Sequence, residues 1–136
     1  MASLTALRQA IGTNIGNNLA NISVYSYVPH RFDPPLAVVS VLENLEYDFS
    51  MARGSDKFII PVRLFVSNID GQDSQETLDA FLNSSGSSSM KVAIESDKTL
   101  GGIASTLRVV EARDYGAFEL NNVELLGVEF LIEVIA

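Results

Sequence analysis

The chain has 136 residues, a length that fits one domain built around a single hydrophobic core. It contains no cysteine, which excludes disulfides, thiolate metal sites and cysteine nucleophiles. Lys and Arg number 9 against 17 Asp and Glu, and the resulting net charge of -8 disfavours binding to a phosphate backbone.

The N-terminal segment predicts an amphipathic helix that starts after Ser3 and runs to about residue 19. Its apolar residues recur at spacings of three and four, and Ser3 can cap the first turn. Gly12 and Gly16 each cost a helix about 1 kcal/mol relative to alanine. Either the apolar stripe packs closely on a flat surface or the helix is shorter than the pattern indicates.

Two strands are predicted next, with a loop between them. Residues with β-branched and aromatic side chains indicate a strand over 22–27, and three prolines place 28–35 in a loop. The continuous apolar run over 36–42 is typical of a central strand that is covered on both faces.

Alternating apolar residues predict a long hairpin of two strands over 45–51 and 58–66, with its turn at 52–57. Pro61 cannot donate a ladder hydrogen bond, so we expect its strand to lie at a sheet edge or to be bulged there. The hairpin is longer than a core of this size needs and has opposite charges at its turn, which favours a contact with another subunit or an assembly partner. The contact residues expected at this hairpin tip are Met51, Arg53, Asp56 and Lys57.

Two further helices are predicted in the middle of the chain. Asp73 and Glu76 have the spacing of a capping box, which predicts a helix over 73–83. After a serine-rich connector, Ser89 is a candidate N-cap for a short third helix.

Three strands complete the predicted fold, over 106–113, 117–120 and 123–135, with turns at 114–116 and 121–122. The order of elements predicts a single α+β domain over residues 1–136. We expect a mainly antiparallel sheet with the N-terminal helix and the two further helices packed on one face.

The sequence contains no pattern typical of a catalytic or metal site. His30 is the only histidine and no nucleophilic-serine motif accompanies it, so a Ser-His-Asp triad is not indicated. The S-x-x-K pattern over 88–91 lacks the companion elements of serine acylases. Asp70, Asp73 and Glu76 have the wrong spacing for a calcium loop, and helix capping explains them. We therefore expect no enzymatic activity, no metal and no cofactor.

The predicted C-terminal strand has one fully apolar face and one mixed face, on which Glu129 and Glu133 alternate with Leu131. A solvent-facing surface with scattered aliphatic residues explains this pattern. A surface that lines a channel or lies at a subunit boundary explains it as well. In a channel the glutamates would crowd like charges, whereas at a boundary they would pair with basic residues such as Arg108 or Arg113.

Four segments spread over nearly the whole chain carry a family resemblance. They are VPHRFDPPLAVV from Val28, LDAFL from Leu78, MKVAIESDKTLGG from Met90 and LGVEFLIEVIA from Leu126. Together they resemble the tail terminator proteins of long-tailed bacteriophages, particularly those that infect actinobacteria. One departure is Lys98, where this family more often has proline.

The resemblance implies a structural virion protein that is assembled in the host cytoplasm and forms a homohexameric ring at the head-proximal end of the tail. Such a ring contacts the tail tube protein, terminates tube polymerisation and offers a docking surface to the head-tail connector or neck protein. DNA only passes through its lumen, and no membrane is involved. A hydrophobic content of 47% is compatible with this, because surplus apolar surface is expected at subunit interfaces.

Three alternatives remain open at the level of sequence. Another neck, tail-completion or tail tube subunit would share the resemblance. A small hydrolase would need a convergent polar pocket, which the sequence does not indicate. A DNA-binding regulator would need a basic stripe, and the basic residues are scattered along the chain.

Overall fold

The computed structural model describes residues 3–19, 22–25, 36–40, 42–47, 56–66, 72–86, 89–120 and 123–136. The helices are α1 (Leu4–Asn18), α2 (Gln72–Leu82) and α3 (Met90–Ile94), followed by a short 3-10 helix over Leu100–Gly102. The strands are β1 (Ser23–Tyr25), β2 (Leu36–Val39), β3 (Asn44–Glu46), β4 (Lys57–Phe65), β5 (Thr106–Leu120) and β6 (Val123–Ile135).

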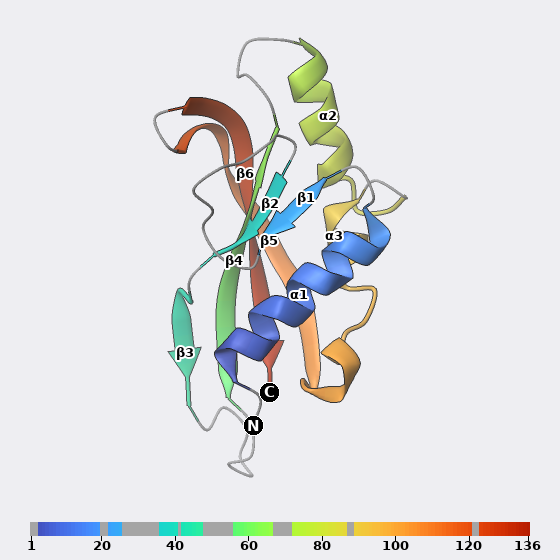
Figure 1. Cartoon of the computed structure of the whole chain (residues 1–136), viewed down its shortest axis with the longest axis vertical. Helices are drawn as coiled ribbons and strands as arrows, with labels where there is room; N and C mark the ends of the chain where they lie inside the picture. Colours follow the sequence, from blue (N-terminus) through green and yellow to red (C-terminus); the bar gives the residue numbers. More distant parts are fainter. Residues whose placement is uncertain are drawn as a thin grey trace.

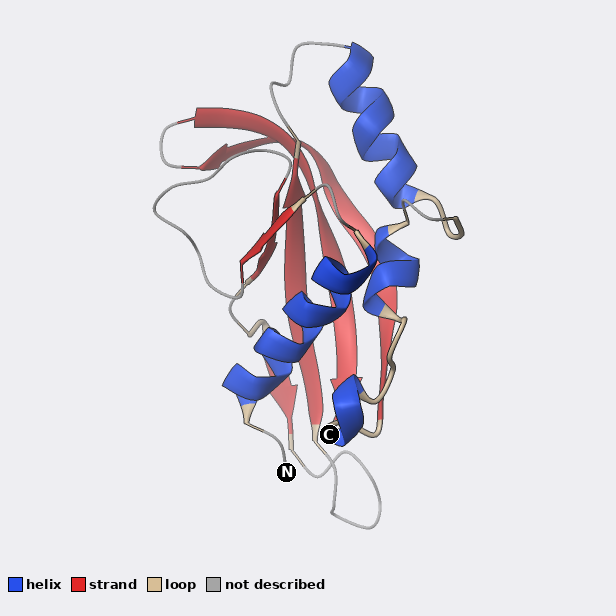
Figure 2. Ribbon diagram, turned by 45° about the vertical axis from the view of Figure 1, so that its right-hand side comes forward, coloured by secondary structure: helices blue, strands red, loops and turns tan. Residues whose placement is uncertain are grey.

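The six strands form one sheet in the order β1-β2-β4-β6-β5, and β3 pairs with β4 beyond the end of β2. The β1–β2 pair is parallel and all other pairs are antiparallel. The three helices lie on the same side of this sheet (Figures 1 and 2). The predicted α+β fold, with a mostly antiparallel sheet and helices on one face, is confirmed. No helix in the described part of the chain is long and apolar enough to span a membrane.

The hydrophobic core lies between the helices and the sheet. The α1 residues Leu7, Ile11 and Ile15 are fully buried. They pack with the even-numbered residues of β4 and β6, because side chains of a strand alternate between the two faces. The apolar face predicted for the C-terminal strand is therefore confirmed, and its buried residues are Leu126, Val128, Phe130, Ile132 and Val134.

Gly12 lets α1 pack closely on the sheet. A Cβ atom at this position would lie 3.4 Å from Cγ1 of Val24 and 4.0 Å from Cγ2 of Val39. α1 continues to Asn18, so the helix is not shorter than its sequence pattern indicates. The other interpretation of the glycines is therefore correct for Gly12: the apolar stripe packs closely on a flat surface. Gly16, by contrast, has no heavy atom within 4 Å of an added Cβ.

We expect Gly16→Ala to stabilise the protein by about 0.5–1 kcal/mol, because alanine loses less conformational entropy than glycine when a helix forms. The space beside Gly16 accepts the methyl group without a clash. Urea unfolding of the variant and the wild type measures the difference. A destabilised variant would show that the backbone at this position requires glycine.

Pro61 lies in an internal strand, so the expectation of an edge strand is wrong. β4 pairs with β6 along its whole length and with β2 and β3 on its other side. The carbonyl of Pro61 accepts a hydrogen bond from the amide of Ser40 at 2.9 Å. The missing N–H of Pro61 therefore faces the interruption between β2 and β3, where no regular ladder has to be continued.

The predicted hairpin over 45–66 differs from the structure. β3 is only three residues long and pairs with the first residues of β4. Asp56 is buried and its backbone exchanges hydrogen bonds of 2.7 and 3.0 Å with Ala136, while Lys57 begins β4. These two residues thus do not belong to an exposed turn, and Met51 and Arg53 lie outside the described residues.

The long hairpin of the molecule is formed by β5 and β6. The turn predicted at 114–116 is wrong, because β5 continues through it with a register shift between Arg113 and Gly116. Asp114 has a φ of 59°, a left-handed conformation that aspartate tolerates better than most residues. The segment is a bulge within one strand, and a second register shift lies between Val109 and Glu111.

Candidate functional site on the outer face of the sheet

The face of the sheet opposite the three helices, here called the outer face, carries the polar residues predicted in β6. Side-chain alternation places the odd-numbered residues of β4 and β6 on it. The strand register then aligns Arg63 of β4, Glu129 of β6 and Arg113 of β5 in one row. Three charged side chains that are far apart in the sequence become direct neighbours in this way.

Glu129 is the centre of an ion-pair network. Its Oε1 accepts a hydrogen bond from Nε of Arg113 at 2.8 Å and lies 2.7 Å from Nη2 of the same guanidinium, and its Oε2 accepts a hydrogen bond from Arg63 at 3.1 Å. Arg113 also donates to Glu43, which precedes β3, at 2.7 Å. The network thereby joins β4, β6 and β5 to the segment before β3, across the outer face.

The network controls the protonation of its members. Burial raises the pKa of Glu129, which is only 4% exposed, but the hydrogen bonds and charges of Arg113 and Arg63 outweigh burial and lower this pKa below its ordinary value. The pKa of Arg113 is raised by Glu43 and Glu129, so its guanidinium stays charged. Glu129 is therefore an ionised carboxylate whose charge is compensated within the chain.

Glu133 and Leu131 lie on the same face. Glu133 pairs with Arg108 at 3.4 Å, and Leu131 is partly buried opposite Pro61 and Glu111. Arg108 and Arg113 are the partners expected for a subunit boundary, but both pairs form within one chain. The glutamates are consequently not the bare charges that the channel interpretation required.

An apolar cluster, here called the outer cluster, adjoins the network on the outer face. Its buried members are Leu36, Val38, Phe65 and Leu125, with Tyr25 and Phe118 packed against them. Phe65 and Phe118 meet edge to face, with ring centroids 5.6 Å apart and an interplanar angle of 81°. Both rings lie over Gly127, which has no side chain to displace them.

The edge strand β5 is an exposed element that sequence reasoning did not identify, because the predicted turn at 114–116 divided it. None of residues 108–119 is buried, and Val110 and Tyr115 are 40% and 45% exposed. The Tyr115 hydroxyl donates to Asp79 of α2 at 2.9 Å, which ties the bulge to the helix layer. A pattern of unusually exposed apolar residues at a sheet edge is visible only once the register is known.

The residues considered for catalysis or metal binding do not come together in the described part of the chain. His30, Ser88 and Asp70 lie outside the described residues, and so does the side chain of Asp73. Ser89 caps α3 by accepting a hydrogen bond from the Val92 amide at 3.2 Å, as predicted. Within the described residues, no group of three His, Cys, Asp or Glu side chains is arranged to hold a metal.

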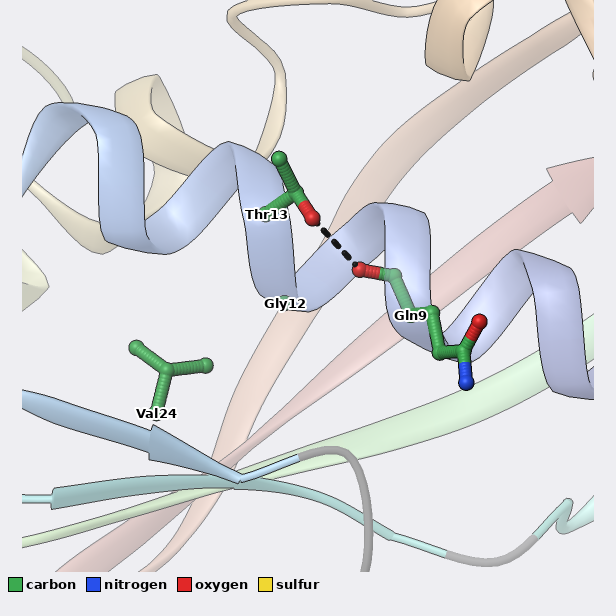
Figure 3. A pocket seen from close by; sticks show the side chains of 4 residues that line it. All are labelled: Gln9, Gly12, Thr13 and Val24. Carbon is green, nitrogen blue, oxygen red and sulfur yellow. Dashed lines mark hydrogen bonds between the residues drawn. The ribbon is translucent and has the colours of Figure 1, made fainter.

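A hollow of about 320 Å³ lies between α1 and β1 (Figure 3). Its described lining residues are Gln9, Gly12, Thr13 and Val24, none of which is charged. Thr13 Oγ1 donates to the carbonyl of Gln9 at 3.0 Å, and the Val24 side chain points from β1 toward α1. No sequence pattern indicates this hollow, because its existence depends on how closely Gly12 approaches the sheet.

The described surface thus combines an internally neutralised charge network, an exposed edge strand and an uncharged hollow. These features suit contacts between proteins, since each offers shape and hydrogen-bonding groups without a set of converging acid and base residues. The chain matches no protein-family model and has no significant match among curated proteins.

Proposed function

We propose that the protein is a structural subunit of a bacteriophage tail, a terminator that forms a ring at the head-proximal end of the tail tube. In this role it stops tube polymerisation and offers a docking surface to the head connector. The proposal combines the family resemblance of the four sequence segments with the surfaces of the fold.

The observation that supports assembly is the exposed edge strand β5. Its outer backbone groups have no strand beside them in the described chain, and Val110 and Tyr115 add apolar surface at the same edge. A long edge of this kind is a liability for a protein that stays monomeric, whereas it is useful to a subunit that assembles. The two bulges shape this edge and restrict the partners that can pair with it.

The distribution of charge is compatible with a ring through which DNA passes. Glu119 and Glu124 face each other directly across β5 and β6 and are exposed, with no ion-pair partner among the described residues. Uncompensated acids of this kind keep the net charge of the surface negative and repel a phosphate backbone. A terminator needs a surface on which DNA does not stick.

We expect the purified full-length protein to form closed rings of one size in electron micrographs, with a matching mass in solution by light scattering. Val110→Lys should prevent ring formation, because it places a charge at the β5 edge. The matched control is Val92→Lys, since Val92 is 43% exposed but belongs to the helix α3 and not to the β5 strand. Tubes that continue to grow would identify a tail tube subunit instead, and a protein that stays monomeric at high concentration would contradict the proposal.

A further inference from the structure

The exposed edge of β5 is not open along its whole length. In an antiparallel ladder, every second residue turns its N–H and C=O groups away from the neighbouring strand. At Val109 the outward amide donates a hydrogen bond of 2.9 Å to Oε2 of Glu95, the residue that ends α3. A side-chain carboxylate therefore occupies the acceptor position that a carbonyl of an added strand would take.

Glu95 is fixed in this position by a second contact. Its other oxygen, Oε1, pairs with Nζ of Lys91 at 2.6 Å, and its side chain is only 15% exposed. Burial raises the pKa of Glu95, but the hydrogen bonds from Lys91 and from the Val109 amide, together with nearby lysine charges, outweigh burial and lower this pKa below its ordinary value. Glu95 is thus an ionised carboxylate at neutral pH, and a charged acceptor forms a stronger hydrogen bond than a neutral one.

The helix itself does not account for an acidic residue at this position. Glu95 is the C-cap of α3, and a negative charge at the C-terminal end of a helix is unfavourable. A lysine four residues before a glutamate is also the weaker order for a stabilising pair on a helix. The contact with the edge of β5 explains the residue, because proteins protect exposed edge strands with charged side chains and with covering helices.

We propose that Glu95 makes an autoinhibitory contact, which closes the β5 edge to strand pairing until its carboxylate leaves the Val109 amide. The inference rests on the proposed function, which assigns this edge to contacts between subunits. A strand of a second copy that pairs with β5 through Val109 must break the Glu95 hydrogen bond before its own carbonyl can accept from this amide. The strength of the contact therefore sets the protein concentration at which subunits assemble.

Glu95→Ala tests the contact by removing the carboxylate. We expect the variant to assemble at a concentration at least about tenfold lower than the wild type, because a hydrogen bond to a charged group no longer has to be broken. Sedimentation velocity over a series of concentrations measures this difference. The matched control is Glu111→Ala, which removes the same charge from an exposed position of β5 itself and leaves the Glu95 contact in place. An equal shift in both variants would overturn the proposal, because net charge alone would then explain it.

Lys91→Ala separates the contact from net charge in the opposite direction. It removes the partner of Glu95 but keeps the carboxylate, and it adds one negative charge to the net charge of -8. General repulsion between acidic subunits predicts weaker assembly of this variant. The autoinhibitory contact predicts stronger assembly, because Glu95 is then fixed by one contact instead of two. Assembly weaker than that of the wild type would overturn the proposal.

Hydrogen exchange of the Val109 amide measures the contact in the unassembled chain. In dilute solution we expect slow exchange in the wild type and much faster exchange in Glu95→Ala, while amides of the β4–β6 ladder stay protected and show that the variant is folded. Wild-type rings with the same assembly concentration in Glu95→Ala would overturn the autoinhibitory contact and leave the proposed function standing. Stronger assembly of Glu95→Ala into open polymers, without closed rings of either protein, would support the contact and contradict the ring. No assembly of either protein would overturn both.

Discussion

Gly127→Ala is expected to destabilise the protein by about 2–3 kcal/mol, although it adds only one methyl group. An added Cβ would lie 2.8 Å from the carbonyl oxygen of Leu64, 2.9 Å from Cδ1 of Phe65 and 3.0 Å from Cδ2 of Phe118. Real Cβ atoms essentially never approach another atom as closely as the first two distances, so the surroundings must shift.

None of these three neighbours can shift cheaply. The Leu64 carbonyl belongs to β4, which pairs with β6 without interruption from Lys57 to Phe65. Moving it disturbs the central ladder of the sheet. Phe65 and Phe118 form the edge-to-face pair of the outer cluster, and separating them exposes apolar surface that this cluster buries.

Denaturant unfolding of the variant measures the loss, and Gly16→Ala is its matched control. Both variants replace glycine with alanine in a regular element, but Gly16 has open space where Gly127 has a carbonyl and two rings. The two changes should therefore shift stability in opposite directions. If Gly127→Ala were as stable as the wild type, β4 and β6 would be less tightly packed at this point than the structure shows.

The alternation of β6 was predictable from the sequence, whereas the role of Gly127 was not. A period of two in apolar residues is a local signal, and it correctly assigned Leu126, Val128 and Phe130 to the core. The need for glycine at 127 depends on Phe65 and Phe118, which the register brings together from two other strands. No local pattern reports a contact among three strands.

The two errors in strand assignment have related physical causes. Asp114 and Gly116 are typical turn residues, but a bulge needs the same left-handed backbone as many turns, so composition does not separate them. Pro61 predicts an edge strand or a bulge because it lacks a donor. In the structure the missing donor is accommodated inside the sheet, because the hydrogen-bonded ladder beside Pro61 is interrupted between β2 and β3.

The ion-pair network was half predictable. Sequence reasoning identified Arg113 and Arg108 as partners for the C-terminal glutamates, from charge alone. It did not identify Arg63 or Glu43, because their contribution depends on β4 lying between β6 and the β2 and β3 strands. Nor could charge alone distinguish pairs within one chain from pairs between two.

Glu129→Gln is expected to cost about 1–3 kcal/mol of stability at neutral pH, because it leaves two guanidinium groups facing a neutral amide. This loss of stability is smaller than the loss expected from breaking a fully buried ion pair, because Arg63 and Arg113 are partly exposed and water can solvate them. Urea unfolding of the wild type and the variant measures the difference. The control is Glu133→Gln, which removes a longer pair to the more exposed Arg108 and should change stability much less.

The pH dependence of that difference identifies its electrostatic origin. The pKa of Glu129 is lower in the folded protein than its ordinary value of 4.5, so the folded state binds this proton more weakly than the unfolded state does. The stabilisation by Glu129 is therefore complete above the ordinary pKa and is lost as the pH falls through the lower, folded pKa. Glutamine does not titrate, so the stability gap between wild type and variant should be constant from about pH 7 to about pH 5.5 and should shrink below pH 4.5. Other carboxylates titrate in both proteins and cancel in the comparison. A gap that stays constant down to pH 3 would mean that packing, rather than the charge of Glu129, accounts for the loss.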